Sequence, residues 1–567
     1  MKKALFLIFG SVLFISISQA QVDHKLITNY WDFEKQHIMS RGFYFVDAFT
    51  GESTLEHGKW SYWNKNGALT EIRNYKRGEL NGEVSLFYLN GNKKEEGYFT
   101  NGVQDGEYKT YYESGKVKTK GQYENGDPYG QWTSYYENSK KHSEEYIENG
   151  QTKMQNFWIY DGTQTLRNGF GEVVWFYESN GNVKEIYKYK NGVKDGEFTE
   201  YSVYGNKLVV GLYANGQKNG KWNFTFYDGN PDTEMHYKNN VLHGPYKKFY
   251  DNGKVNIEGS FANGEKQDHW IWYTNVGTID MQGDFDAGQQ DGKWEYWYAG
   301  DSLHKKYEGH YAQGERDGQW QFYYPTGENW KDGHYKNDLE NGEWTTWWEN
   351  GQVLSRGNFV DGKENGIWIQ NFDNGKLKNK AEFVNGKLDG IWESYYKKGN
   401  IHISGLYENN LKVGEWLKYS PKRILIEKGN YKLVKYQKSM NYGPFGDRDK
   451  LNESVKDGHW VWYSSKDGGK THEGSYRKGK EEGQWIYYYP GGTKAMQELS
   501  YKDGKLNGTT VKYSWRPHRV TSRIDYKNGV KDGKMVIYDR RGKVSIQKNF
   551  KAGVEINKDG KPTHFTP

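Results

Sequence analysis

Apolar and polar residues alternate along short runs of this chain. In one such run Trp344, Thr346 and Trp348 share one side of the alternation, while Thr345 and Trp347 share the other. A period of two is typical of β-strands, whose successive side chains point to opposite faces. Glycine recurs every few residues, which disfavours helix. The pattern predicts strands with one nearly all-aromatic face and one charged face that carries a single aromatic side chain.

The runs repeat with a period of 24 residues. The aromatic anchor of a Gly-x-aromatic motif returns at this step in Trp344, Trp368, Trp392 and Trp416. Counting anchors from Trp60 to Met535 gives 20 units, with Trp158 as the anchor of a degenerate one. Fixed-period self-similarity indicates a repeat protein in which each unit contacts its neighbours.

Each unit is expected to be a β-hairpin. Asn350-Gly351 separates two strand-like runs and is a strong signal for a two-residue turn, because both residues tolerate positive φ. Such a turn would place Trp344 opposite Gly357, and the same rule would place Trp368 opposite Ala381 in the next unit. We expect Gly357 to leave room for the indole of Trp344 to lie across the neighbouring strand.

The predicted fold is all-β: an elongated repeat protein of about 20 tandem β-hairpins that form a long twisted antiparallel meander sheet. The expected organisation is a signal peptide (1–20), an N-terminal capping segment (21–57), hairpin repeats (58–432) with a degenerate unit (151–170), a non-repeat insertion without hairpin form (433–457), further repeats (458–556) and a C-terminal tail (557–567).

The N-terminus has the pattern of a secretion signal. Lys2 and Lys3 precede an apolar run, and Ser18-Gln19-Ala20 places small residues at positions −3 and −1 of a cleavage site. The apolar run of about 14 residues is too short to span a bilayer. We expect export with cleavage after Ala20, a periplasmic, cell-surface-associated or secreted mature protein, and no transmembrane segment in it.

Composition narrows the classes of function. The 567 residues include 23 Trp, 49 Tyr and 25 Phe, which supply the large buried area that the scarce aliphatic residues cannot. The absence of Cys excludes disulfides, thiol catalysis and Cys-ligated metals. A net charge of +6, dispersed over this length, argues against nucleic acid as a partner.

No motif predicts catalysis. No His-Glu-x-x-His pattern and no Gly-x-Ser-x-Gly elbow occurs. Gly468-Gly469-Lys470-Thr471 is similar to the end of a phosphate loop, but Ser464 stands where that loop has its first glycine. We therefore predict no enzyme, no catalytic residue, no cofactor and no metal. A paired-carboxylate hydrolase stays open as an alternative, as does an enzyme that acts on glycans.

Two segments carry the resemblance of this chain to a known family. Residues 342–351, Gly-Glu-Trp-Thr-Thr-Trp-Trp-Glu-Asn-Gly, and 357–362, Gly-Asn-Phe-Val-Asp-Gly, resemble the bacterial MORN-repeat variant, and the resemblance extends over about 58–556. It implies β-hairpin repeats stacked into an extended sheet, with no catalytic residues. Many such proteins carry the label of the YwqK-type toxin–antitoxin antitoxin family, and ordinary MORN repeats are associated with lipid or protein scaffolding. Aromatic–Gly hairpins also resemble choline- and glucan-binding repeats.

The charged face offers the candidate binding residues. Its lone aromatics are Trp297, Tyr323, Trp347 and Tyr395, and the insertion adds Tyr442 and Phe445 as a candidate binding loop. We expect the aromatic side chains of this face to form a continuous stripe. Either a partner covers this stripe, or the sheet curls and the rings pack against each other. The leading hypothesis is an exported scaffold that binds a protein partner through this surface. The alternatives are a binder of envelope glycan or lipid, and an antitoxin-type protein that neutralises a toxin partner.

Overall fold

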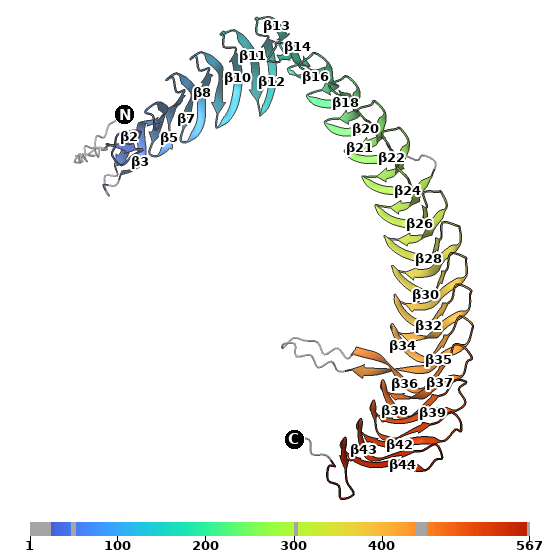
Figure 1. Ribbon diagram of the computed structural model, residues 1–567. Helices are drawn as coiled ribbons and strands as arrows, with labels where there is room; N and C mark the ends of the chain where they lie inside the picture. The colour runs from blue at the N-terminus through green and yellow to red at the C-terminus, as the bar shows by residue number, and fades with distance from the viewer. Residues whose placement is uncertain (1–23, 47–50, 52, 300–303, 437–450, 564–567) are drawn as a thin grey trace, which may run out of the picture. The chain divides into compact units, whose positions relative to one another are not determined.

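The computed structural model describes residues 24–46, 51, 53–299, 304–436 and 451–563, which form 45 strands and no helix. Strands that follow each other in the sequence pair antiparallel in one sheet (Figure 1), except that β5 and β6 both pair with β4, and β40 and β41 both pair with β39. The all-β hairpin meander predicted from the sequence is confirmed. The chain divides into two compact units, Met1–Glu265 (unit 1) and Lys266–Pro567 (unit 2).

The strands of unit 1 are β1 (His24–Tyr30), β2 (Ile38–Val46), β3 (Ser53–Trp63), β4 (Leu69–Lys76), β5 (Glu79–Leu80), β6 (Gly82–Phe87), β7 (Lys93–Thr100), β8 (Val103–Tyr111), β9 (Val117–Glu124), β10 (Asp127–Tyr135), β11 (Lys141–Glu148), β12 (Gln151–Trp158), β13 (Gln164–Arg167), β14 (Phe170–Phe176), β15 (Val183–Lys190), β16 (Val193–Tyr201), β17 (Lys207–Ala214), β18 (Gln217–Thr225), β19 (Pro231–Lys238), β20 (Val241–Phe249) and β21 (Val255–Ala262). β22 (Glu265–Tyr273) begins at the last residue of unit 1.

The remaining strands of unit 2 are β23 (Ile279–Asp286), β24 (Gln289–Trp297), β25 (Lys305–Ala312), β26 (Glu315–Tyr323), β27 (Asn329–Lys336), β28 (Leu339–Trp347), β29 (Val353–Val360), β30 (Lys363–Asn371), β31 (Leu377–Val384), β32 (Lys387–Tyr395), β33 (Ile401–Glu408), β34 (Leu411–Tyr419), β35 (Leu425–Tyr436), β36 (Leu451–Tyr463), β37 (Lys470–Arg477), β38 (Lys480–Tyr488), β39 (Ala495–Lys502), β40 (Lys505–Leu506), β41 (Gly508–Tyr513), β42 (Val520–Lys527), β43 (Val530–Tyr538), β44 (Val544–Lys551) and β45 (Val554–Ile556).

The cross-strand register follows the prediction, but the turn type does not. Trp344 of β28 pairs with Gly357 of β29, and Trp368 pairs with Ala381. The two-residue turn with positive φ at both positions is Asp361-Gly362, between β29 and β30. Residues 348–352 instead form a longer loop, in which the Asn350 side chain accepts a hydrogen bond from the backbone of Gln352. This side-chain turn stabilises Asn350 with negative φ.

The indole rings lie over glycines of the preceding strand, so the expectation that Gly357 makes room for the Trp344 indole is wrong. A Cβ atom built on Gly333 of β27 would lie 2.1 Å from Cδ2 of Trp344, and one on Gly357 would lie 2.0 Å from Cδ2 of Trp368. The ladder shifts register beside both glycines. At Gly333, the indole N–H of Trp344 donates to the carbonyl of the next residue, His334, at 3.1 Å.

The core is an aromatic ladder on one side of the sheet, here called the aromatic face. Trp344 is 2% exposed and meets Tyr335 edge-to-face at 5.0 Å and Phe359 at 6.3 Å between ring centroids. The same edge-to-face alternation continues from Phe359 to Trp368. Lys331 Nζ covers the Trp344 ring at 4.2 Å from its centroid. Edge-to-face aromatic pairs contribute about 0.5–1.5 kcal/mol each beyond area burial, so neighbouring hairpins stabilise each other.

Two segments within the chain depart from the regular repeat. In the degenerate unit the buried anchor is Phe157, 0% exposed, and not Trp158 as expected, because Phe157 packs with Leu166 and Val173. The two ends of 433–457 do form a hairpin, contrary to expectation. There β35 and β36 pair out to Tyr436 and Leu451, so this hairpin is longer than its neighbours (Figure 1).

At the N-terminus, residues 24–46 of the expected capping segment form β1 and β2, and β2 pairs with β3. The predicted signal peptide and the candidate loop residues Tyr442 and Phe445 lie outside the described residues. The part of the chain that is described contains no helix long and apolar enough to cross a membrane.

Candidate functional site: the polar face

The side of the sheet opposite the aromatic face is here called the polar face. In β28 it carries Glu343, Thr345 and Trp347, whose neighbours along the strand point to the aromatic face. Thr345 pairs with Arg356 of β29 and with Asp332 of β27. Cross-strand neighbours on one face lie close enough for their side chains to interact. The chemistry of this face is therefore set by pairs from adjacent strands.

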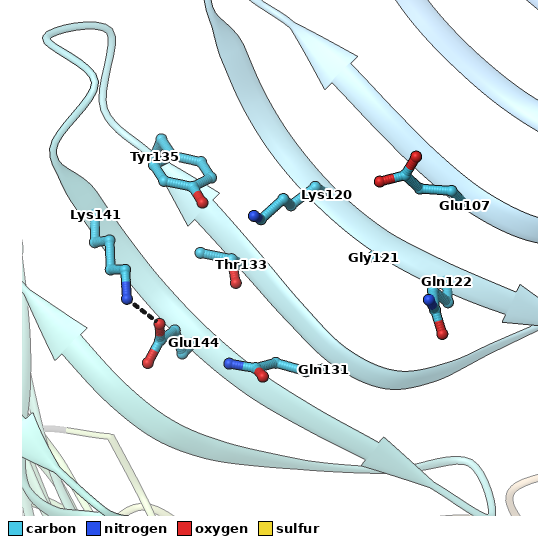
Figure 2. Close-up of a pocket in the computed structure, with 9 residues that line it drawn as sticks. All are labelled: Glu107, Lys120, Gly121, Gln122, Gln131, Thr133, Tyr135, Lys141 and Glu144. Atoms are coloured by element: carbon cyan, nitrogen blue, oxygen red, sulfur yellow. Dashed lines mark hydrogen bonds and ion pairs between the residues drawn. The ribbon is translucent and has the colours of Figure 1, made fainter.

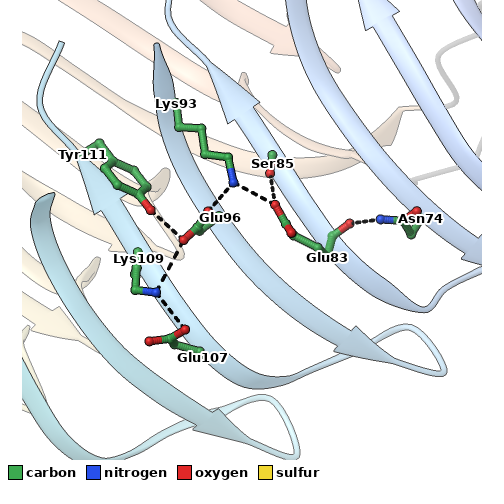
Figure 3. Close-up of polar contacts among 8 residues, drawn as sticks. All are labelled: Asn74, Glu83, Ser85, Lys93, Glu96, Glu107, Lys109 and Tyr111. Carbon is green, nitrogen blue, oxygen red and sulfur yellow. Dashed lines mark hydrogen bonds and ion pairs between the residues drawn. The ribbon is translucent and has the colours of Figure 1, made fainter. Parts of the chain in front are cut away.

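A cluster of Lys, Glu and Tyr recurs on the polar face. In unit 1, Glu96 accepts hydrogen bonds from Lys93 at 2.5 Å and from the Tyr111 hydroxyl at 2.6 Å (Figure 3). In unit 2 the same spacing joins Lys305, Glu308 and Tyr323, at 2.8 Å for both bonds, and also Lys470, Glu473 and Tyr488. These clusters, here called the Lys–Glu–Tyr clusters, pair the charges within the protein itself.

Hydrogen bonding in these clusters fixes the carboxylates in their charged form. Burial disfavours the charge of Glu308, but hydrogen bonds from Lys305, Lys293 and Tyr323 outweigh it and lower the pKa of this carboxyl. Glu295 beside it responds in the same way, and its pKa falls to about 2. The pKa of the Tyr323 hydroxyl is raised, by burial and then by its bond to Glu308. These groups therefore keep one protonation state near neutral pH.

Each unit has a pocket on its polar face. The pocket in unit 1 has a volume of about 450 Å³ and lies between Lys120, Tyr135 and Glu144 (Figure 2). Both carboxylates are paired, Glu144 with Lys141 at 2.5 Å and Glu107 with Lys109 at 2.7 Å, and Lys120 Nζ lies 5.8 Å from the centre of the Tyr135 ring. The pocket in unit 2 is larger, about 790 Å³, and it includes Trp347.

The four predicted aromatics occupy one register position on the polar face of unit 2, but they are half-buried and unequal. They are Trp297, Tyr323, Trp347 and Tyr395. The hydroxyls of Tyr323 and Tyr395 are held by Glu308 and Glu393. The two Trp side chains have no hydrogen-bond acceptor among the described residues.

The predicted continuous stripe is wrong. Asn371 takes the aromatic position between Trp347 and Tyr395, and its amide binds the carbonyl of Val353 at 3.0 Å. The alternative in which the four rings pack on each other is not found either, since none of them contacts another aromatic ring in the described structure. Of the four predicted aromatics, Trp347 is therefore the last of three in consecutive repeats, and the row is interrupted after it at Asn371.

Sequence reasoning missed Asp332 and Arg356, which line the Trp347 pocket together with Glu343, Thr345 and His334. Arg356 lies 3.6 Å from Glu343. The available signal was the spacing of the Lys–Glu–Tyr cluster, which Asn329, Asp332 and Trp347 repeat with three different residues. Among the described residues no group of three or more His, Asp and Glu side chains is placed to hold a metal ion.

A family model described as MORN repeat variant matches eight segments: 56–77, 80–101, 104–125, 242–263, 316–337, 340–361, 364–385 and 388–409. The segments fall in both units and reproduce the 24-residue step. The resemblance seen in the sequence is thereby confirmed. No curated protein matches the sequence.

Comparison with solved structures adds no functional argument. The chain is 10% identical to a chain in the crystal structure of TcdB2-TccC3-Cdc42, covering 95% of itself and 30% of that chain, with a TM-score of 0.12. With a chain of the Photorhabdus luminescens Tc holotoxin pore the identity is 10%, the coverage is 93% of this chain and 29% of that chain, and the TM-score is 0.12. With alternansucrase in complex with isomaltononaose the identity is 14%, the coverage is 64% of this chain and 23% of that chain, and the TM-score is 0.12. The chain thus spans under a third of each of these chains, and likenesses with TM-scores this low support no conclusion about this protein.

Proposed function

Since this chain carries MORN repeats of the variant type, we propose that it is an exported, non-enzymatic scaffold that binds a protein partner through the polar face of unit 2. One observation carries the proposal: Trp297 and Trp347 stand where other repeats hold a Tyr bonded to a carboxylate, and both indoles lack an acceptor among the described residues. Trp and Arg are the residues that most often anchor protein interfaces. Here Trp347 shares its pocket with Arg356.

Exposed aliphatic side chains on β30, β32 and β33 favour a protein over a glycan as the partner. Ile367 is 53% exposed and Ile391 is 39% exposed, at a position that is Glu343 in β28. Ile391 pairs directly with Leu406, which is 44% exposed. Ile367 pairs with Glu382, so Ile391 and Leu406 form the contiguous apolar pair. Contiguous exposed apolar side chains mark interaction surfaces for other proteins. Glycan binding relies on stacked rings and hydrogen-bonding groups, which this pair lacks.

Replacing Trp297 and Trp347 together by Ala should abolish partner capture while the protein stays folded. Truncating two interface anchors costs about 2 kcal/mol or more each in binding. The measurement is capture of envelope proteins by immobilised wild type and by the double variant, with melting followed by circular dichroism. Trp515→Ala is the matched control, because Trp515 is 38% exposed and lies outside the sheet strands.

Two results would reject the protein partner. Wild type that binds purified envelope glycan or liposomes and captures no protein would support the glycan or lipid alternative. Equal capture by wild type and the double variant would show that the polar-face indoles do not bind the partner. A captured partner that is toxic when expressed without this protein would favour the antitoxin alternative.

Export is the second part of the proposal and rests on the pattern from Lys2 to Ala20. Protein recovered from the envelope or the medium should have an intact mass that begins at Gln21. Retention of Met1 in that fraction would contradict cleavage. The control is the same chain with both small residues of the cleavage site made bulky (Ser18→Phe with Ala20→Phe), which should block cleavage because the signal peptidase needs small residues there.

A further inference from the structure

One hairpin of unit 2 lacks every internal partner that its neighbour provides. Counting 24 residues on from Lys305, Glu308 and Tyr323 leads to Asn329, Asp332 and Trp347. The ammonium group is replaced by an amide, the phenol by an indole, and the carboxylate is kept on a shorter side chain. The first two changes remove the contacts from Lys305 and Tyr323 that hold Glu308.

Asp332 is consequently left alone. Carboxylates at the same register position on the polar face are bonded: Glu96 to Lys93, Glu144 to Lys141, Glu234 to Lys221, Glu308 to Lys305 and Glu473 to Lys470. Asp332 is half-buried and has neither a hydrogen bond nor an ion pair among the described residues. Burial raises the pKa of this carboxyl, and the charges of His334 and Arg356 lower it by less.

The missing partners leave space in the same place. The pocket of about 790 Å³ is lined by Asp332 and Trp347, with Asp317, Glu343, Arg356 and Lys336 as its other charged residues. Arg356 lies near Glu343 at 3.6 Å. The lining thus carries three carboxylates and two cationic side chains, so the pocket retains an excess of negative charge.

We propose that this pocket receives a Lys or Arg side chain of the partner protein, with its charge on Asp332 and its stem against the Trp347 ring. The inference deepens the proposed function and rests on it, because it names the group of the protein partner that enters the polar face. The incoming cation takes the position that Lys305 holds in the preceding hairpin, where Nζ lies 2.8 Å from Glu308.

Elsewhere the protein holds one of its own ammonium groups in the same kind of contact. Lys331 Nζ lies 4.2 Å from the centre of the Trp344 ring and also bonds Glu340 at 2.8 Å, so one ammonium group contacts an indole and a carboxylate together. Cation–π contact and a charge-assisted hydrogen bond favour the same class of ligand. An acidic or neutral side chain of the partner would bring no positive charge to the Asp332 carboxylate.

The test uses the full chain labelled with 5-fluorotryptophan and free side-chain probes. The ¹⁹F resonance of Trp347 is assigned by its loss in Trp347→Phe. N-acetyl-arginine amide and N-acetyl-lysine amide should shift this resonance saturably, and N-acetyl-glutamine amide should not. Asp332→Asn should weaken the shift at least tenfold. Equal shifts with the neutral probe, or in Asp332→Asn, would overturn the proposal.

A rebuilt cluster separates this inference from the proposed function. Asn329→Lys with Asp332→Glu and Trp347→Tyr restores the cluster of the preceding hairpin, so the variant should keep its melting temperature and lose the partner. Asn329→Lys alone should shift the Trp347 resonance and prevent a further shift by the probes. If the partner is lost in Trp297→Ala with Trp347→Ala but retained by Asp332→Asn, the proposed function stands and the cation site is wrong. If wild type binds the arginine probe but captures no protein, the pocket chemistry stands and the protein-partner form of the proposal is overturned.

Discussion

Trp344→Ala should lower the free energy of unfolding of the hairpins around β28 by about 3–5 kcal/mol, the usual cost of truncating a buried Trp. The indole is 2% exposed, touches Tyr335 and Phe359 edge-to-face, and donates its N–H to the carbonyl of His334. Removing it opens a cavity between adjacent units and leaves that carbonyl without the indole donor.

Hydrogen exchange of the intact protein measures this effect locally. Repeat proteins are stabilised by nearest-neighbour contacts, so protection should fall in β27 to β29 and recover a few strands away. Trp515→Ala provides the control, because its ring is 38% exposed. Unchanged exchange in β27 to β29 would mean that the aromatic ladder does not hold the sheet together.

Gly333→Val should destabilise the same region by about 1–3 kcal/mol, the range for overpacking a close contact. Any Cβ at Gly333 would lie 2.1 Å from Cδ2 of Trp344, so the ring or the strand must move. Chemical denaturation of the variant measures the loss.

A double variant tests the stated cause of that loss. With Trp344→Ala already present, Gly333→Val has no ring to displace, so its additional cost should fall well below its cost in wild type. Simple addition of the two losses would assign the effect of Gly333→Val to the backbone of β27 and not to the indole.

The sequence was sufficient for the period, the strands and the pairing within each hairpin, because alternation and turn residues are local signals. It was insufficient for the position of the rings. β28 lies between β27 and β29, and the pairing of Trp344 with Gly357 does not reveal that the indole leans toward Gly333 on the other side. That choice depends on the register shift beside Gly333, which only the assembled sheet shows.

The turns were ambiguous for a related reason. Asn350-Gly351 and Asp361-Gly362 have the same chemical character, and either could adopt positive φ at both residues. The structure places the two-residue turn at Asp361-Gly362, while Asn350 bonds the backbone within a longer loop. A local pattern cannot rank two turns that occur in the same unit.

The candidate site was only partly predictable. Trp347 follows from alternation on the charged face, and its register position is where the sequence placed it. Asp332 and Arg356 come from the two flanking strands, and their importance depends on contacts that are missing rather than on a motif. Comparing each unit with its neighbours, position by position, would have identified Asn329, Asp332 and Trp347 as a departure.

We propose that the two faces of the sheet have different roles: the aromatic face stabilises the sheet, and the polar face binds the protein partner. Trp344 and Trp347 test it most directly, because they are the same residue type on one strand and face opposite sides. Circular dichroism melting of Trp344→Ala and Trp347→Ala, measured in parallel, should show a large loss of stability for the first and a change within about 1 kcal/mol for the second. An equal loss in both variants would show that Trp347 belongs to the core and would contradict a binding role for the polar face.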